Sequence, residues 1–280
     1  MLSTLIFFLD FICLHIYSVK DGFHYTEVLM TELFEGERID EVNDKLKLIQ
    51  KPEGLTFGTD ALLLAGYVSG KNPLGLELGA GSGIISFLLL TRGKTNEVLA
   101  LEVQEDYARL TERNTELNGL SDVMKTVHID LRDFKVEESF DIVYTNPPYM
   151  TVGSGLANAF SGKNLARHEV MGDIGDFCRC AAASLKFGGK FAVVYRPDRL
   201  TDLLAAMREY KLEAKRMTFV HADTESEPSM VLIEAKKGGK CGLMLTAPLI
   251  IYNDKEHKKY TADMDYIMEC GNFPEKFLRR

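Results

Sequence analysis

The sequence predicts an α/β fold in which a mostly parallel sheet of seven strands carries helices on both faces. Short apolar runs alternate with amphipathic stretches from Asp40 onward, which is typical of repeated strand and helix units. A glycine-rich turn also joins the first of these apolar runs to the helix that follows it. We expect strands at residues 74–78, 98–101, 126–129, 140–144, 191–195, 217–220 and 230–235.

The helices between these strands are expected where apolar residues recur at helical spacing. Leu110 and Leu117 share one face of a helix that Asn118-Gly119 ends with a left-handed cap. Gly188-Gly189 stops a later helix, and Pro197 opens the next one in its first turn. The expected helices cover residues 84–89, 104–117, 174–185 and 197–207.

The composition is that of a globular enzyme with one main core. The chain has 280 residues, 46% of them hydrophobic and 26% charged, which suits one substantial α/β domain. None of the five cysteines forms a C-x-x-C pair, so we expect reduced thiols in the cytosol. No pattern suggests a metal site.

Charge is distributed unevenly along the chain. The net charge of −8 divides into −2 for residues 1–29, −9 for residues 30–150 and +3 for residues 151–280. This asymmetry fits a single domain over residues 30–280, with a cofactor half at about 46–150 and a target-recognition half at about 151–280 that meets phosphates. An excess of three positive charges is also common on an ordinary solvated surface.

The first 29 residues form an apolar extension that resembles neither a signal peptide nor a good membrane span. No Lys or Arg precedes the apolar run, and Asp10 and His15 interrupt it. We expect this extension to be non-native or unstructured, with Met30 as the natural start. A membrane anchor is the alternative, but no stable membrane association is expected, and the predicted location is the cytoplasm.

A glycine loop follows the first predicted strand. Gly79, Gly81 and Gly83 have the spacing G-x-G-x-G, and Ile84 excludes the G-x-G-x-x-G dinucleotide pattern. Glycines at this place let the backbone approach a ligand beside the amides of a helix N-terminus. An ordinary strand-to-helix turn is the alternative.

Two acidic residues end the next two strands. Glu102 follows Gly79 by 23 positions, where a carboxylate can accept hydrogen bonds from both hydroxyls of a ribose. Asp130 is placed to face an adenine amine at the same edge. Each residue has a structural alternative, because Glu102 could cap the following helix and Asp130 the following turn.

The sequence Asn146-Pro147-Pro148-Tyr149 follows the fourth strand directly. The two prolines fix the backbone and hold the preceding carbonyls as acceptors. Oxygens of the Asn146 side chain and the Pro147 carbonyl could accept both protons of a planar NH2 group, which frees its lone pair for attack on a methyl sulfonium. Tyr149 could stack on the substrate. The motif therefore predicts methyl transfer to a planar nitrogen.

The pairing of E-x-G-x-G-x-G with N-P-P-Y resembles the class I S-adenosylmethionine methyltransferases, over about residues 46–235. This resemblance implies a Rossmann-like fold and S-adenosylmethionine as the cofactor. The chain is more closely similar to the bacterial tRNA1(Val) adenine-N6-methyltransferases, which act on the base next to the valine anticodon. That likeness rests on residues 57–64 (FGTDALLL), 166–169 (ARHE), 195–200 (YRPDRL) and 248–249 (PL).

By this resemblance, two sets of residues would form the site. Phe57 and Asp60 would close the methionine side of the cofactor pocket. The full cofactor set would be Phe57, Asp60, Glu77, Gly79, Ala80, Gly81, Gly83, Glu102, Val103, Asp130 and Leu131, and the catalytic set Asn146, Pro147, Pro148 and Tyr149.

The partner expected from these sequences is tRNA. Plausible phosphate contacts lie in the basic C-terminal half, although each charge alone is as readily a solvated surface residue. The alternatives are a protein glutamine N5-methyltransferase of the release-factor type, whose amide target is also planar, and an rRNA base N-methyltransferase. The candidate RNA-binding residues are Arg167, His168, Arg196, Arg199, Lys236 and Lys237.

Overall fold

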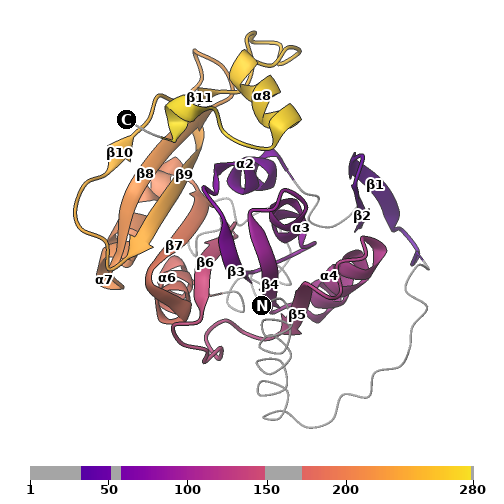
Figure 1. Cartoon of the computed structure of the whole chain (residues 1–280). Coiled ribbons are helices and arrows are strands. Elements are labelled where there is room, and N and C mark those ends of the chain that lie inside the picture. Colours follow the sequence, from indigo (N-terminus) through magenta and orange to yellow (C-terminus); the bar gives the residue numbers. More distant parts are fainter. Residues whose placement is uncertain (1–32, 52–57, 149–171, 279–280) are drawn as a thin grey trace, which may run out of the picture.

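The structure is a computed structural model that describes residues 33–51, 58–148 and 172–278. Its centre is a mixed sheet, flanked by helices (Figure 1). Five neighbouring strands are parallel, and β9 runs antiparallel between β7 and β8. The main strands are β3 (Asn72–Leu78), β4 (Thr95–Glu102), β5 (Met124–His128), β6 (Phe140–Thr145), β7 (Leu185–Tyr195), β8 (Leu212–His221) and β9 (Pro228–Lys237).

The predicted α/β class is confirmed, but the predicted strand number is too low. Within the described ranges the sheet has nine strands in the order β10-β8-β9-β7-β6-β3-β4-β5, with β11 also beside β8. The two extra strands, β10 (Met244–Leu245) and β11 (Leu249–Ile250), have two residues each. Two residues are too few to show an alternating pattern. A separate antiparallel hairpin consists of β1 (Arg38–Asn43) and β2 (Leu46–Gln50).

The helices cover the two faces of the sheet. Apolar residues of α6 and α7 belong to one core cluster, and those of α2, α3 and α8 belong to a second one. Each cluster includes alternate residues of the same strands, as expected when a sheet is buried on both sides. The helices are α2 (Thr59–Tyr67), α3 (Ile84–Thr91), α4 (Glu105–Leu117), α6 (Ile174–Ser184), α7 (Leu200–Glu209) and α8 (Ala262–Cys270), with short 3-10 turns η2 (Pro197–Arg199) and η3 (Glu275–Phe277).

The junction of α6 and β7 differs from the sequence expectation. The helix ends at Ser184, and β7 begins at the next residue, so Gly188 and Gly189 lie inside the strand. The register of β6 with β7 shifts there, and Gly188 has a φ of +79°. A positive φ is a conformation that glycine adopts at little cost, which explains how a glycine pair fits within a bulged strand.

The ends of β3 and β6 are joined at the centre of the sheet. β3 lies between β4 and β6. The chain therefore continues from β3 to β4 on one side and from β6 to β7 on the other, which reverses the strand order between β3 and β6. The Thr145 hydroxyl donates a hydrogen bond of 2.7 Å to the carbonyl oxygen of Leu78. Open α/β sheets bind ligands at the carboxyl ends of their strands where the strand order reverses.

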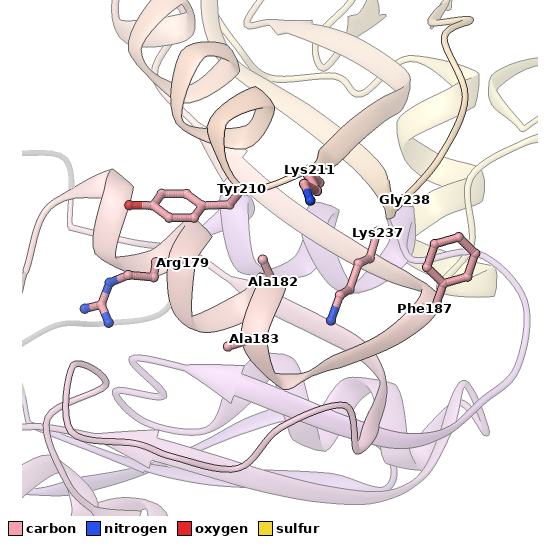
Figure 2. A pocket seen from close by; sticks show the side chains of 8 residues that line it. All are labelled: Arg179, Ala182, Ala183, Phe187, Tyr210, Lys211, Lys237 and Gly238. Carbon is pink, nitrogen blue, oxygen red and sulfur yellow. The ribbon is translucent and has the colours of Figure 1, made fainter.

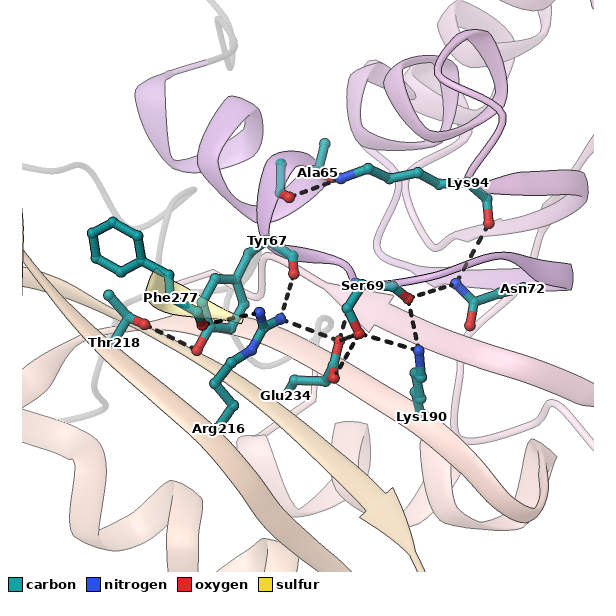
Figure 3. A network of polar contacts seen from close by, with 11 residues as sticks. Ala65, Tyr67, Ser69, Asn72, Lys94, Lys190, Arg216, Thr218, Glu234 and Phe277 are labelled. Carbon is teal, nitrogen blue, oxygen red and sulfur yellow. Dashed lines mark hydrogen bonds and ion pairs between the residues drawn. The ribbon is translucent and has the colours of Figure 1, made fainter. Parts of the chain in front are cut away.

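A buried polar network fixes the C-terminal segment to the sheet (Figure 3). Arg216 of β8 donates hydrogen bonds to the carbonyl oxygens of Tyr67 at 2.5 Å and Phe277 at 3.3 Å. Its guanidinium lies 3.8 Å from the centre of the Tyr67 ring and pairs with Glu234 at 3.3 Å. Ser69 donates to the same carboxylate. The end of α2, two strands and η3 are therefore held by one charged group.

Lys94 supports the same end of α2. Its ammonium donates to the carbonyl oxygens of Ala65 and Gly66 at 2.8 and 2.7 Å, which satisfies acceptors at a helix C-terminus. Burial lowers the pKa of Lys94 to about 7. The described helices include none that is long and apolar enough to cross a membrane.

Candidate active site

The glycine loop between β3 and α3 has the backbone that its sequence predicts. Gly79, Gly81 and Gly83 have φ values of +73°, +59° and +83°, which side-chain-bearing residues adopt only with strain. The N–H groups of Gly79 and Ala80 donate to the Leu101 carbonyl at 2.9 and 3.0 Å. The loop is thereby fixed to the end of β4.

One glycine of this loop borders space that a ligand could occupy, and another is packed against side chains. A Cβ atom added at Gly81 would meet no atom within 4 Å, so this residue borders open space. A Cβ at Gly83 would lie 2.8 Å from side-chain atoms of Phe87 and Thr111. Gly81 therefore leaves room for a ligand, whereas Gly83 is required for packing at the N-cap of α3.

Two side chains of α4 hold the loop from behind, and neither role was predicted from the sequence. The Thr111 hydroxyl donates to the Gly81 carbonyl at 2.8 Å, and the Asn114 amide donates to the Ser82 carbonyl at 3.2 Å. Asn114 also accepts from the N–H of Ile49 at 2.7 Å, which joins β2 to the same unit. Helical periodicity places Asn114 on the buried face of α4, but it cannot predict a hydrogen bond to Ser82, 32 residues away in the sequence.

Glu102 lies at the carboxyl end of β4 with only 4% of its surface exposed. One carboxylate oxygen accepts from the Gly81 N–H at 2.8 Å and the other from the Gln104 N–H at 2.9 Å. Burial raises the pKa of Glu102, while these backbone hydrogen bonds oppose that rise. The backbone of Val103 also hydrogen-bonds to this carboxylate. A carboxylate has about four lone-pair sites, so capacity for a further donor remains, and the geometry is compatible with both the ribose role and the structural role.

The segment after β5 forms a tight acidic turn. Asp130 accepts from the backbone N–H of Arg132 at 2.8 Å and pairs with its guanidinium at 2.5 Å. The structure therefore contains the turn that was the alternative for Asp130. Leu131 is buried, and the carbonyl of Val103 lies 3.0 Å from Nε2 of His128, so both predicted residues belong to this edge.

Glu77 is placed differently from the other predicted cofactor residues. It is 1% exposed and accepts a hydrogen bond from the Ser86 hydroxyl of α3, which lies 2.6 Å from the hydroxyl of Tyr144. Burial raises the pKa of Glu77 to about 8. At neutral pH the side chain is therefore largely protonated and sits beneath α3, where it supports the end of β3.

Asn146 follows β6 at the same edge. Its side-chain Nδ2 donates a hydrogen bond of 2.7 Å to Oδ2 of Asp60, in the first turn of α2. Pro147 is buried and Pro148 is exposed. The structure thus brings Asp60 to the predicted catalytic motif, 86 residues later in the chain.

A pocket of about 320 Å³ opens beside Asp60. Besides Thr59 and Asp60, its lining comes from the end of β7 and the start of β9, which supply an aromatic ring, a guanidinium and a thioether. A flat base can stack on such groups. The additional lining residues are Tyr195, Arg196, Ser229 and Met230.

The predicted RNA-binding residues fall on two edges of the sheet. Arg196 and Arg199 follow β7 at the carboxyl edge, where they pair with Asp198 and Asp202 at 2.5 Å. Lys236 lies opposite Lys190 in the antiparallel pair of β7 and β9, so it and the next residue are near the other edge.

Lys237 lines a second pocket, of about 460 Å³, at that other edge (Figure 2). Its ammonium donates to the Leu185 carbonyl at 2.8 Å and pairs with Glu138 at 3.1 Å. Phe187, which is 79% exposed, and Tyr210 also border this pocket. The structure does not bring these lysines to the catalytic motif.

Four predicted site residues lie outside the described residues: Phe57, Tyr149, Arg167 and His168. Among the side chains that the structure does describe, no group of three or more His, Cys, Asp or Glu is arranged to hold a metal ion.

Residues 53–219 match the family described as methyltransferase small domain. The chain belongs to this family. It is 30% identical over 185 residues to the tRNA1(Val) (adenine(37)-N6)-methyltransferase of Phocaeicola vulgatus, a match that covers 65% of this chain and 77% of the relative. A Porphyromonas gingivalis protein of the same name is 27% identical over 215 residues, covering 73% and 80% of the two chains.

A solved structure supports the fold. The crystal structure of a predicted O-methyltransferase from Agrobacterium tumefaciens aligns with a TM-score of 0.62 at 23% identity, over 77% of this chain and 98% of the other. The family and the fold together confirm the predicted enzyme class: the chain is an S-adenosylmethionine-dependent methyltransferase.

Proposed function

We propose that this enzyme transfers a methyl group from S-adenosylmethionine to the N6 amine of an adenine in tRNA, at the base next to the anticodon of valine tRNA. The observation that carries the proposal is the position of Asn146. It directly follows β6, which pairs with β3, the strand that leads into the glycine loop. Its side chain is hydrogen-bonded to Asp60, which lines the 320 Å³ pocket. The named activity of the relatives from P. vulgatus and P. gingivalis supports the same substrate.

The cofactor would lie against the glycine loop. Gly79, Ala80 and Gly81 would border it with their backbone, whose N–H groups are held by the Leu101 carbonyl and by Glu102. The N–H groups of the first turn of α3 would face it, and Glu102 would accept from its ribose. Val103, Asp130 and Leu131 would border its adenine, Phe57 its methionine end, and Glu77 and Gly83 would support the loop from within. S-adenosylmethionine supplies a methyl group on a positively charged sulfur, which a nitrogen lone pair displaces to leave a neutral thioether.

The chain's own residues would prepare the nucleophile. The Asn146 side-chain oxygen and the Pro147 carbonyl would accept the two N–H groups of the adenine amine. These hydrogen bonds would fix the directions of both N–H bonds, and the nitrogen lone pair would then be directed at the methyl carbon. The nitrogen is positively charged once its new bond to carbon has formed, and it returns to zero charge by losing one proton to solvent water.

The pocket beside Asp60 would receive the flipped-out base or its neighbour. Tyr195 is 8% exposed and lies in the lining together with Arg196. Aromatic and guanidinium planes stack on bases irrespective of sequence, and enzymes that modify a base take it out of its stack. Tyr149 would complete this stack from the N-P-P-Y motif. The flanking RNA phosphates would be met by Arg167, His168, Arg196 and Arg199.

The test compares cells with and without the gene. We propose that the enzyme acts in the cytoplasm. In cells that lack the gene, valine tRNA should contain no N6-methyladenosine next to the anticodon, and mass spectrometry of nuclease fragments of bulk tRNA measures this. Release factors and rRNA from the same cells should keep their methyl groups. Loss of a release-factor methyl group, with tRNA methylation unchanged, would contradict the proposal and would indicate a protein glutamine N5-methyltransferase.

A further inference from the structure

We propose that Asp60 is a positioning residue, which orients the Asn146 side chain so that its oxygen, and not its nitrogen, faces the target amine. The inference rests on the proposed function in one respect, because it takes Asn146 as the acceptor for that amine. It assigns to Asp60 a task other than contact with the cofactor.

The geometry of the pair determines the orientation. The Nδ2 atom of Asn146 lies 2.7 Å from Oδ2 of Asp60. An ionised carboxylate has no proton to donate, so the atom of the Asn146 amide that it contacts must be the NH2 group. The amide oxygen then points away from Asp60. A rotation of 180° would place two acceptors against each other and would direct NH2 at the substrate.

The orientation matters because the substrate amine is itself a donor. An Asn146 side chain that presented its NH2 group would oppose N–H to N–H. It could not accept a hydrogen bond from the amine and so could not raise the electron density on the amine nitrogen. A free asparagine amide has no strong preference between the two orientations, since its oxygen and nitrogen are nearly the same size. A charge-assisted hydrogen bond is about twice as strong as a neutral one, which suffices to select one orientation.

Asp60 is itself held in the first turn of α2, which begins at Thr59. Its other carboxylate oxygen, Oδ1, accepts from the N–H of Ala61 at 2.9 Å, and a carboxylate in the first turn is favoured by the helix dipole. The carboxylate is thus fixed between the N-terminus of α2 and the Asn146 amide.

Gly58 leaves the space in which this carboxylate lies. A Cβ atom built on Gly58 would be 2.6 Å from Oδ1 of Asp60 and 3.6 Å from its Cγ. The φ of Gly58 is −108°, so alanine is conformationally acceptable there. Gly58→Ala is therefore expected to displace the carboxylate without straining the backbone.

The first experiment uses an exchanged pair. Asp60→Asn removes the charge that selects the Asn146 orientation, and Asn146→Asp places two carboxylates together. In the double variant, the amide at position 60 can donate to one oxygen of the carboxylate at position 146, and the other oxygen remains an acceptor for the amine. We expect kcat for valine tRNA to fall by about tenfold or more in each single variant. The double variant should recover at least part of this loss.

The separation of kcat from binding distinguishes positioning from other roles. Asp60→Asn should leave the Kd for S-adenosylmethionine and the KM for tRNA close to those of the wild type. A weaker cofactor affinity with unchanged kcat would make Asp60 a cofactor ligand and overturn the proposal, as would a double variant no more active than its parents. If the wild-type enzyme methylates no tRNA, the proposed function has failed, and that result is visible before any Asp60 variant is measured.

A second variant tests the same point without changing the charge. Gly58→Ala should lower kcat and leave the cofactor Kd unchanged. Gly66→Ala is the matched control in the same helix, since its Cβ would meet Ile267 and Phe273 at an ordinary distance of 3.5 Å. Equal kcat values for the two alanine variants would contradict the positioning role.

Discussion

Oε2 of Glu102 lies 2.8 Å from the backbone nitrogen of Gly81. The acidic residue at the end of β4 and the glycine loop at the end of β3 are therefore directly joined. A substitution of either residue should lower the affinity for S-adenosylmethionine. Glu102 keeps acceptor capacity beyond this bond and beyond its bond to Gln104.

Glu102→Ala should weaken the binding of S-adenosylmethionine by about 1.5 to 3 kcal/mol, the value of a hydrogen bond to a charged group. Isothermal calorimetry measures this difference directly. Glu105→Ala is the control, because Glu105 is exposed at the start of α4 and pairs with Arg109. An affinity equal to that of the wild type would mean that Glu102 only holds the loop.

Gly81→Ala should combine a modest loss of stability with a large loss of cofactor binding. The φ of +59° costs an alanine about 1 to 2 kcal/mol, and the new methyl group would enter the open space next to the loop. We expect cofactor affinity to fall by about tenfold or more, which is at least about 1.4 kcal/mol.

Gly93→Ala is the matched control for this variant. Gly93 has a φ of +64°, and an added Cβ would also meet no atom within 4 Å, but the residue lies in the turn between α3 and β4. It should lose similar stability in urea denaturation and keep its cofactor affinity. A similar affinity in both alanine variants would place the cofactor elsewhere.

Protonated Glu77 predicts a pH dependence of stability. Its pKa is raised from 4.5 to about 8 in the folded protein, so between these values the folded state holds a proton that the unfolded state has released. The contribution of Glu77 to the free energy of unfolding is therefore largest below pH 4.5 and decreases as the pH rises towards 8.

Glu77→Gln should abolish this dependence, since glutamine does not ionise. Urea denaturation at several pH values would show the variant gaining stability relative to the wild type as the pH rises through the window, by an amount on the order of a few kcal/mol. Parallel stability curves for the two proteins would show that Glu77 is ionised in the fold.

Arg196 should contribute to tRNA affinity, because it lines the pocket next to Asp60. Arg196→Ala is expected to reduce the slope of the logarithm of the tRNA binding constant against that of the salt concentration by about one unit. Arg109→Ala removes another exposed, ion-paired arginine, from α4, and should leave the slope unchanged. Identical slopes for both variants would remove Arg196 from the RNA contact.

The RNA contact that the sequence predicts for Lys236 and Lys237 is tested separately. Neutralising both should weaken tRNA binding if RNA also reaches the other edge of the sheet, and the same salt titration measures this. Because the Lys237 side chain is only 18% exposed, against 45% for that of Arg196, it should contribute less than Arg196. A wild-type slope in the double variant would restrict the RNA to the carboxyl edge.

Local spacing was enough to predict which candidate site residues lie at one edge of the sheet, while their roles stay predictions. Glycines after one strand, Glu102 after the next and Asn146 after a third must meet, because parallel strands end at one edge. The bond from Asn146 to Asp60 and the contact of Thr111 with Gly81 join segments 86 and 30 residues apart, and no local pattern carries such pairings. The cofactor role expected for Asp60 gave no hint of this partner.

Periodicity had a similar limit in the fold. It located the seven long strands but not β10 or β11, whose two residues pair with β8 only in the folded sheet. Gly188-Gly189 predicted a break between elements, whereas pairing with β6 at Leu185 and Lys190, on either side of the two glycines, keeps the strand continuous through them.

The most direct test of the account is methylation of unmodified valine tRNA by the purified enzyme, with the modified base located by mass spectrometry of nuclease fragments. We expect one N6-methyladenosine next to the anticodon, none in a tRNA with guanine at that position, and none with Asn146→Ala, although this variant should bind S-adenosylmethionine as the wild type does. Methylation of a release factor and of no tRNA, or full activity of Asn146→Ala, would contradict it.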